Sequence, residues 1–175
     1  GQALNKMLAL AEVRDIDHIK VYSRDAENRR KFVDRVSPMI ETDMTPVDTP
    51  REVMKDVDIV ICATNSNVPV FDGDWIEPGQ HVITVVGSNS ALVTAGWLKT
   101  GRRENDDKTV ERADFIVTNH LESISQDEQA GLWEPLRQGL ITWDKIFALG
   151  AVLNGSHPGR TSDEQITYHF NNNGT

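Results

Sequence analysis

Two polar residues, Thr64 and Asn65, follow an apolar run at 58–63 that has the length of a buried strand. In an open α/β sheet, ligands bind beyond the carboxyl ends of the strands. The hydroxyl of Thr64 and the amide of Asn65 can hydrogen-bond a ribose or a phosphate. The same two residues also fit a polar turn that leads to Pro69, so both interpretations stay open from the residues alone.

A second polar segment, Gly87-Ser88-Asn89, follows the apolar run 81–86. A glycine at the end of a strand lets the backbone approach a ligand closely. Asn89 can donate and accept hydrogen bonds, but its amide cannot take up or release a proton as a general acid or base does. This segment is therefore suited to binding a ligand.

The chain starts with Gly1-Gln2-Ala3, ahead of apolar residues at helical spacing. The N-terminus of a helix attracts anions, because its first backbone N–H groups lack helical partners and the helix dipole is positive there. The small side chain of Ala3 permits a phosphate to come close. Taken alone, these residues are more typical of an ordinary N-terminal turn.

The identity of the nucleotide depends on the second predicted strand. A carboxylate about 20 residues after a glycine-rich turn usually binds the ribose 2′-hydroxyl of NAD. Here Ser23 takes that position and Arg24 follows it. Serine removes a charge that would repel a 2′-phosphate, arginine can bind a phosphate with two hydrogen bonds, and Arg29 can add positive charge. These residues favour NADP(H), while Asp25 leaves NAD(H) possible, with Arg24 as a plain surface residue.

The composition excludes several classes of function. A net charge of −9 over 175 residues, with no long basic cluster, argues against a nucleic-acid partner. No apolar stretch approaches the ~18 to 20 residues of a membrane span. Cys62 lies in an apolar run and is expected in the core. No metal is expected, because no ligand spacing such as HExxH is found among His18, His81, His120, His157 and His169.

Predicted strands and helices alternate along the chain, which is typical of a parallel sheet covered on both faces. Thr49-Pro50-Arg51-Glu52 has the sequence of a capping box, with proline at the first helical position. We expect strands at 19–22, 58–63, 81–86 and 114–118, helices at 3–13, 25–36, 49–57, after 107, at 125–138 and at 143–153, and a closing segment at 166–170.

These elements predict a Rossmann-type, doubly wound parallel sheet, in a single domain over residues 1–175. Such a fold begins with a strand that leads through a glycine-rich turn into the first helix. Here the helix is present and the strand before it is not. We therefore expect that the first strand is truncated and that the chain is cut from a longer protein.

Six segments in order along the chain resemble the ornithine cyclodeaminase/μ-crystallin family. Gly1-Gln2-Ala3 is similar to the end of its GxGxQA phosphate loop, and Val21-Tyr-Ser-Arg24 to its second strand. The segments 63–70 and 86–89 resemble its ATxSxxPV and VGA/S-x loops. The segment 158–167 is similar to its PGRTSxxxIT segment, and 173–175 to the glycine turn that follows.

The resemblance implies a central nucleotide-binding domain of a homodimer. The dimer contacts, and most residues that bind the small amino-acid or imino-acid substrate, are expected outside this chain. The nicotinamide should lie close to the loop after residue 86. The expected cofactor-binding residues are Gly1, Gln2, Ala3, Ser23, Arg24, Arg29, Thr64, Asn65, Gly87, Ser88 and Gly174.

Asn89 departs from the pattern of the cyclodeaminases in this family, which carry an aspartate in this loop as the general acid/base. The expected function is therefore that of a cytoplasmic NADP(H)-dependent oxidoreductase that reduces an imino acid or oxidises an amino acid, with Asn89 binding the substrate nitrogen or carboxylate. One alternative is an ornithine cyclodeaminase-like ammonia lyase with bound NAD. Another is a non-catalytic, nucleotide-binding protein of the μ-crystallin type.

Overall fold

The computed structural model describes residues 1–171. They form two compact units, one over Gly1–Lys55 and the other from Asp56 onward. Within these residues no helix is both long enough and apolar enough to cross a membrane. The single domain expected over 1–175 stays a prediction.

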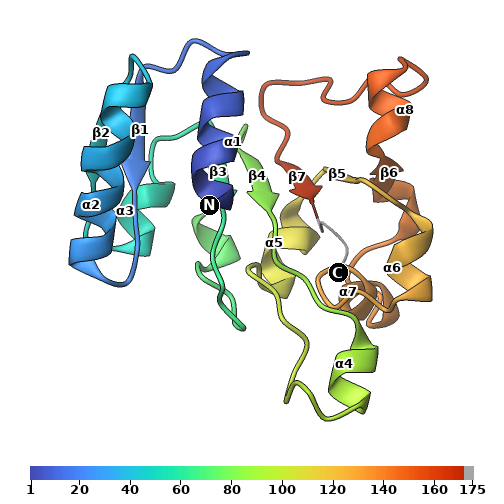
Figure 1. Cartoon of the computed structure of the whole chain (residues 1–175). Coiled ribbons are helices and arrows are strands. Elements are labelled where there is room, and N and C mark those ends of the chain that lie inside the picture. Colours follow the sequence, from blue (N-terminus) through green and yellow to red (C-terminus); the bar gives the residue numbers. More distant parts are fainter. Residues whose placement is uncertain (172–175) are drawn as a thin grey trace. The chain divides into compact units, whose positions relative to one another are not determined.

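The first unit contains a pair of parallel strands, β1 (His18–Val21) and β2 (Asp43–Pro46). Helix α2 (Ala26–Val36) packs against β2 and against the short 3₁₀ helix η1 (Ser37–Met39). The unit also contains α1 (Gln2–Ala11) and α3 (Pro50–Met54). Figure 1 shows these elements in blue to teal.

The helix starts predicted at Asp25 and Thr49 are confirmed. The Asp25 carboxylate caps α2 by accepting the Asn28 N–H at 2.9 Å. The Thr49 hydroxyl caps α3 by accepting the Glu52 N–H at 3.2 Å. The reciprocal bond of a capping box differs slightly, because the Glu52 carboxylate accepts the N–H of Asp48, the residue before the cap.

Strand β2 was not expected from the sequence. Its four residues, Asp-Met-Thr-Pro, include two types that are depleted in strands. Proline has no N–H for a ladder and is confined mostly to edge strands. Within the two-stranded sheet, β2 pairs with β1 alone, which is where a proline is tolerated.

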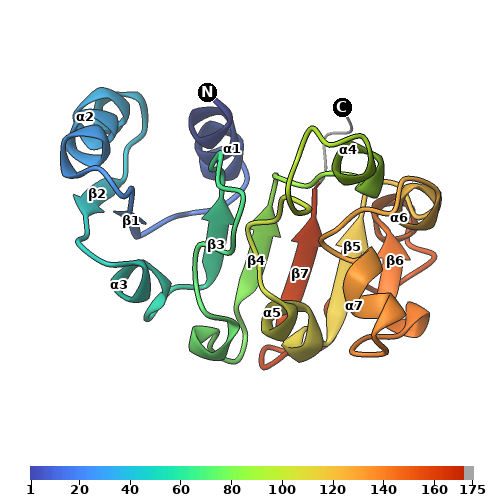
Figure 2. The ribbon, with the colours of Figure 1, turned by 90° about the horizontal axis from the view of Figure 1, so that it is seen from below.

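The second unit is built on a five-stranded sheet in the order β3-β4-β7-β5-β6, parallel at every pairing. The strands are β3 (Ile59–Cys62), β4 (His81–Thr84), β5 (Phe115–Thr118), β6 (Ile146–Ala148) and β7 (Thr167–Phe170). Figure 2 shows the last strand, β7, between β4 and β5. This parallel α/β sheet confirms the predicted fold class.

Helices cover both faces of this sheet, as the alternation predicted. Figures 1 and 2 together show α5 (Asp107–Arg112) and α7 (Trp133–Arg137) on one face and α8 (Leu149–Leu153) on the other. Helix α5 packs against α7 and the 3₁₀ helix η2 (Gly73–Trp75). The remaining helices are α4 (Ser90–Thr94), α6 (Glu122–Gln126) and the 3₁₀ helix η3 (Trp143–Lys145).

Two predicted helices were wrong in extent. The helix expected at 125–138 is divided into α6 and α7 by a turn in which Glu128 has a positive φ of 46°. The helix expected at 143–153 consists of η3, strand β6 and α8. Short apolar runs such as Ile146–Ala148 fit a helix and a buried strand equally well, and only pairing with β5 decides between them.

The core of the second unit consists of the inward side chains of the sheet and the helices on it. Val82, Ile116 and Tyr168 are almost completely buried. Cys62 is also buried, as expected, and burial together with the negative charge of Glu104 raises the pKa of its thiol. This cysteine is a core residue.

Candidate functional site

The segments that follow β3 and β4 are joined by one carboxylate. Glu104 is fully buried, and its Oε1 accepts the Thr64 N–H at 2.6 Å. Its Oε2 accepts the N–H groups of Val85 and Val86 at 2.9 and 3.0 Å. The predicted ligand-binding segments at Thr64 and Gly87 are therefore anchored to the same side chain.

Arg102, two residues earlier, contacts both segments as well. Its backbone N–H donates to the Ser88 hydroxyl at 2.7 Å, and its guanidinium donates to the Asn65 carbonyl at 3.3 Å. The Nε atom of Arg102 is buried and has no hydrogen-bond partner among residues 1–171. The segment from Arg102 to Glu104 thus fastens the two strand ends to each other.

Asn89 caps the short helix α4. Its Oδ1 accepts the Leu92 N–H at 3.2 Å, which leaves the Nδ2 group as the donor available to a ligand. Asn89 also forms an isolated antiparallel bridge with Gln129, and the Ala130 N–H donates to the Ser88 carbonyl at 3.0 Å. The segment after α6 is thereby held beside the segment after β4.

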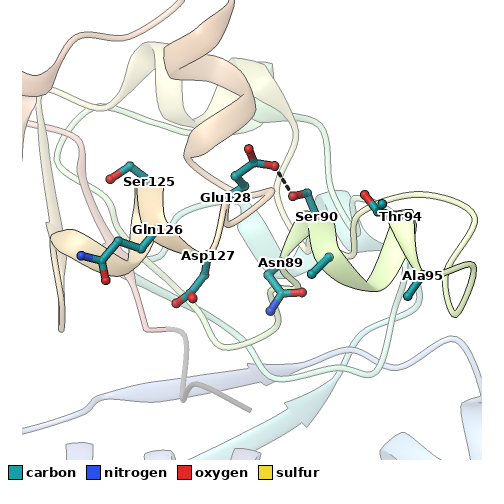
Figure 3. A pocket seen from close by; sticks show the side chains of 9 residues that line it. Asn89, Ser90, Thr94, Ala95, Ser125, Gln126, Asp127 and Glu128 are labelled. Carbon is teal, nitrogen blue, oxygen red and sulfur yellow. Dashed lines mark hydrogen bonds between the residues drawn. The ribbon is translucent and has the colours of Figure 1, made fainter.

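These two segments line a pocket of about 540 Å³. Figure 3 shows its side chains, with the polar ends of Asn89 and Asp127 turned toward the same opening. The Ser90 hydroxyl donates to the Glu128 carboxylate across the pocket wall. Among residues 1–171, the lining includes two carboxylates and no Lys, Arg or His, so it favours a ligand group that carries positive charge or donates hydrogen bonds.

In the first unit, the N-terminus of α1 has the features of an anion site. Gly1 is the N-cap residue and provides no side-chain cap, and the first turn contains no acidic residue. The N-terminus of this ten-residue helix can attract an anion, because its first backbone N–H groups lack helical partners and the helix dipole is positive there.

The three residues predicted to choose the nucleotide differ in their surroundings. Arg24 is exposed, and the structure gives it no ion pair with any residue from 1 to 171. Arg29 is buried, donates to the Ser23 carbonyl at 3.0 Å and pairs with the Asp48 carboxylate. Of the two arginines, Arg24 therefore has the guanidinium that a phosphate can reach.

The structure groups the predicted residues by unit. Thr64, Asn65 and the segment 87–89 converge through Glu104 and Arg102 in the second unit. The residues Gly1 to Ala3 and Ser23 to Arg29 belong to the first unit. Gly174 lies outside the described residues. Within those residues, no group of three or more His, Cys, Asp or Glu side chains is arranged to hold a metal ion.

Sequence reasoning missed Glu104 and Asp127. Glu104 is 40 residues from Thr64 and 18 from Val86, and Asp127 is far along the chain from Asn89, with which it lines the pocket, so no local motif marks either residue. The only sequence feature near Glu104 is its place two residues before the helix cap at Asp106. That feature does not predict burial, because Glu104 becomes buried only through long-range packing. No signal in the sequence points to Asp127.

The model of the ornithine cyclodeaminase/mu-crystallin family matches residues 1–174 of the chain. The chain is 28% identical over 160 residues to Delta(1)-pyrroline-2-carboxylate reductase of Bacillus cereus, a match that covers 91% of this chain and 46% of the relative. The chain therefore spans about half the length of the curated relatives that it matches.

Solved structures resemble the chain over nearly its full length. Delta(1)-pyrroline-2-carboxylate reductase of Thermococcus litoralis, in complex with NADH and L-proline, has a TM-score of 0.82 at 28% identity, covering 98% of this chain and 50% of that one. An archaeal alanine dehydrogenase dimer with bound NAD has a TM-score of 0.81 at 25% identity, covering 98% of this chain and 49% of that one.

Proposed function

The chain belongs to the ornithine cyclodeaminase/mu-crystallin family, and on that premise we propose that it is the nucleotide-binding part of a nicotinamide-dependent oxidoreductase. The proposed reaction is the reduction of an imino acid or the oxidation of the corresponding amino acid. The names of the relatives, a pyrroline-carboxylate reductase and an alanine dehydrogenase, support this reaction class.

The observation that carries the proposal is the hydrogen bonding and position of Asn89. Its amide oxygen caps α4, and its amide nitrogen remains for a ligand in the pocket. An amide neither takes up nor releases a proton near neutral pH, so Asn89 cannot act as the acid/base of an ammonia lyase. Hydride transfer needs no such group at this position, because the bound nicotinamide supplies the hydride.

The chain's own residues bind and orient the cofactor in this proposal. The N-terminal turn of α1, from Gly1 to Ala3, binds the pyrophosphate. Thr64 and Asn65 bind ribose or phosphate, and Gly87 and Ser88 lie beside the nicotinamide. Gly174 contributes from the segment beyond the described residues.

We assign the preference for NADP(H) to Ser23 and Arg24. The exposed Arg24 guanidinium binds the 2′-phosphate, while Arg29 holds the Ser23 carbonyl in place. The two solved neighbours named above hold NADH or NAD, so the preference rests on these residues of the present chain.

The substrate class follows from the charge of the pocket. Asp127 is exposed at the opening that Asn89 also faces, and no cationic side chain of the described part of the chain lines the pocket. A protonated imine or an ammonium group suits this environment. The substrate carboxylate and the dimer contacts are assigned to parts of the full protein outside this chain.

The proposal is tested on the full-length protein by titration with NADPH and NADH in parallel, followed by nicotinamide fluorescence. The protein is then given a cyclic imino acid together with the preferred reduced cofactor. Oxidation of the cofactor that depends on the imine is the expected result. Release of ammonia from ornithine without a net change in nicotinamide absorbance would indicate the lyase instead, and binding without any turnover would indicate a nucleotide-binding protein of the μ-crystallin type.

A further inference from the structure

The carboxylate of Glu104 is buried and yet has no part in the chemistry described above. It lies between the segments that follow β3 and β4, and it accepts N–H groups from both. Because Thr64, Val85 and Val86 lie beyond the last paired residues of their strands, these N–H groups are outside the ladder bonds of the sheet. The Glu104 carboxylate satisfies all three of them.

The three hydrogen bonds use both oxygens of the Glu104 side chain as acceptors. A carboxylate is an acceptor at both oxygens, whereas a glutamine has one acceptor and an NH₂ group that only donates. In Glu104→Gln, the NH₂ group would therefore replace one of the two accepting oxygens and would face a backbone N–H group, which is also a donor. Aspartate keeps the charge but is one methylene shorter, so it cannot keep the same reach to both segments.

We propose that Glu104 is a positioning residue for the cofactor, and this inference rests on the proposed function. Its carboxylate sets the spacing of two backbone segments, one that carries Thr64 and Asn65 and one that carries Gly87 and Ser88. Both segments contact the nucleotide in the proposal, so a change in their spacing alters how the nicotinamide is held.

Asp106 is a matched control on the same segment. Its carboxylate also accepts three hydrogen bonds, from the Gly73 N–H and from the N–H and hydroxyl of Thr109. These bonds fasten η2 and the start of α5, and none of them involves the segments after β3 and β4. Glu104 is buried and Asp106 is half-buried. A purely structural role for carboxylates that accept several hydrogen bonds predicts similar defects when the side chain of either Glu104 or Asp106 is replaced by its amide.

The experiment compares Glu104→Gln, Glu104→Asp and Asp106→Asn in the full-length protein. Thermal unfolding identifies a temperature at which each variant is fully folded, and all binding and kinetic measurements are made there. The readouts are the dissociation constant of the preferred reduced cofactor, the KM for that cofactor and kcat at saturation.

We expect Glu104→Gln to weaken cofactor binding at least tenfold and to lower kcat at saturating cofactor. The Asp106→Asn variant should have lower thermal stability than the wild type. Its dissociation constant for the cofactor and its kcat should stay within about twofold of the wild-type values. Glu104→Asp should fall between the wild type and Glu104→Gln, and it supplies the comparison if the glutamine variant does not fold.

Two results overturn the inference while leaving the proposed function intact. One is wild-type cofactor binding and kcat in folded Glu104→Gln, or in folded Glu104→Asp where the glutamine variant does not fold. The other is an equal loss of binding and kcat in Asp106→Asn. Failure of the proposed function is distinct, because the wild-type protein alone reveals it: that protein would bind neither NADPH nor NADH, release ammonia from ornithine, or bind the cofactor without turnover of the imine.

Discussion

The Arg29 guanidinium donates a hydrogen bond of 3.0 Å to the backbone carbonyl of Ser23, six residues earlier. The same guanidinium pairs with the Asp48 carboxylate, so helix α2 is tied to the end of β1 and to the segment before α3. Arg29 is buried and Arg24 is exposed. Two arginines close in sequence thus have different surroundings, and mutation can separate their contributions.

Replacement of Arg24 by alanine is expected to weaken NADPH binding by about tenfold or more, because a charge-assisted hydrogen bond contributes about 1.5–3 kcal/mol. NADH binding should change by less than about twofold, since NADH has no 2′-phosphate. Fluorescence titration of both cofactors against wild type and variant measures the ratio. Equal losses for NADPH and NADH would contradict the assignment of Arg24.

Replacement of Arg29 by alanine should act mainly on stability. The change leaves the Ser23 carbonyl without its partner and removes the ion pair between the buried guanidinium and the exposed Asp48 carboxylate, with an expected cost of about 1–3 kcal/mol. At a temperature where the variant is folded, the ratio of NADPH to NADH affinity should stay closer to the wild-type ratio than it does in Arg24→Ala. A larger change in that ratio for Arg29→Ala would reverse the roles of the two arginines.

Asn89 can be tested by two substitutions with different chemistry. Asn89→Ala removes the cap of α4, at an expected cost of about 1 kcal/mol, and also removes the donor that faces the pocket. Asn89→Asp keeps a capping oxygen and introduces a carboxylate that can transfer protons. We expect imine reduction to fall in both variants and ammonia release from an amino acid to rise in Asn89→Asp alone. A wild-type protein that releases ammonia as fast as Asn89→Asp would disprove this reading of Asn89.

The contact between Gly131 and Phe170 limits the size of residue 131. A Cβ at Gly131 would lie 2.5 Å from Cε2 of the Phe170 ring, which is 1% exposed. Gly131→Ala is therefore expected to lower the free energy of unfolding by about 1–3 kcal/mol through overpacking. Urea unfolding measures the change.

The control for this prediction is the double variant Gly131→Ala/Phe170→Leu. The smaller leucine removes ring atoms that would meet the new methyl group. The two substitutions should therefore destabilise the protein less together than the sum of their separate effects. Additive effects would show that the clash is relieved elsewhere.

The stability of the fold should depend on the protonation of His81. Burial and the positive charge of Arg160 lower the pKa of His81 to about 4, and its Nδ1 is 2.7 Å from the Thr167 hydroxyl. In the unfolded chain the histidine pKa is about 6.5, so between pH 6.5 and 4 the unfolded state binds more protons than the native state. The free energy of unfolding should fall with decreasing pH in this window, by at most about 1.4 kcal/mol per pH unit from this residue.

Urea unfolding from pH 4 to 7.5 checks the dependence on His81. His81→Asn keeps a polar atom near the position of Nδ1 and removes the titration, so its stability should fall less steeply below pH 6.5. Identical slopes for wild type and His81→Asn would exclude His81 as the cause.

Much of the local structure could be predicted because it depends on neighbouring residues. The caps at Asp25 and Thr49 follow from side chains that reach backbone N–H groups three residues away. The apolar runs at 59–62, 81–84 and 115–118 form strands because each is short and is buried in the sheet. Family membership and fold class were also predicted, because ordered motifs persist along the chain.

Only the tertiary structure decided which distant segments meet. Ile146–Ala148 became a strand because it pairs with β5, and β7 entered the middle of the sheet between β4 and β5. Glu104 reaches the strand ends at Thr64 and Val86 across 40 and 18 residues of chain. Sequence patterns record the preferences of neighbouring residues, whereas the burial of a carboxylate depends on donors that long-range packing brings to it.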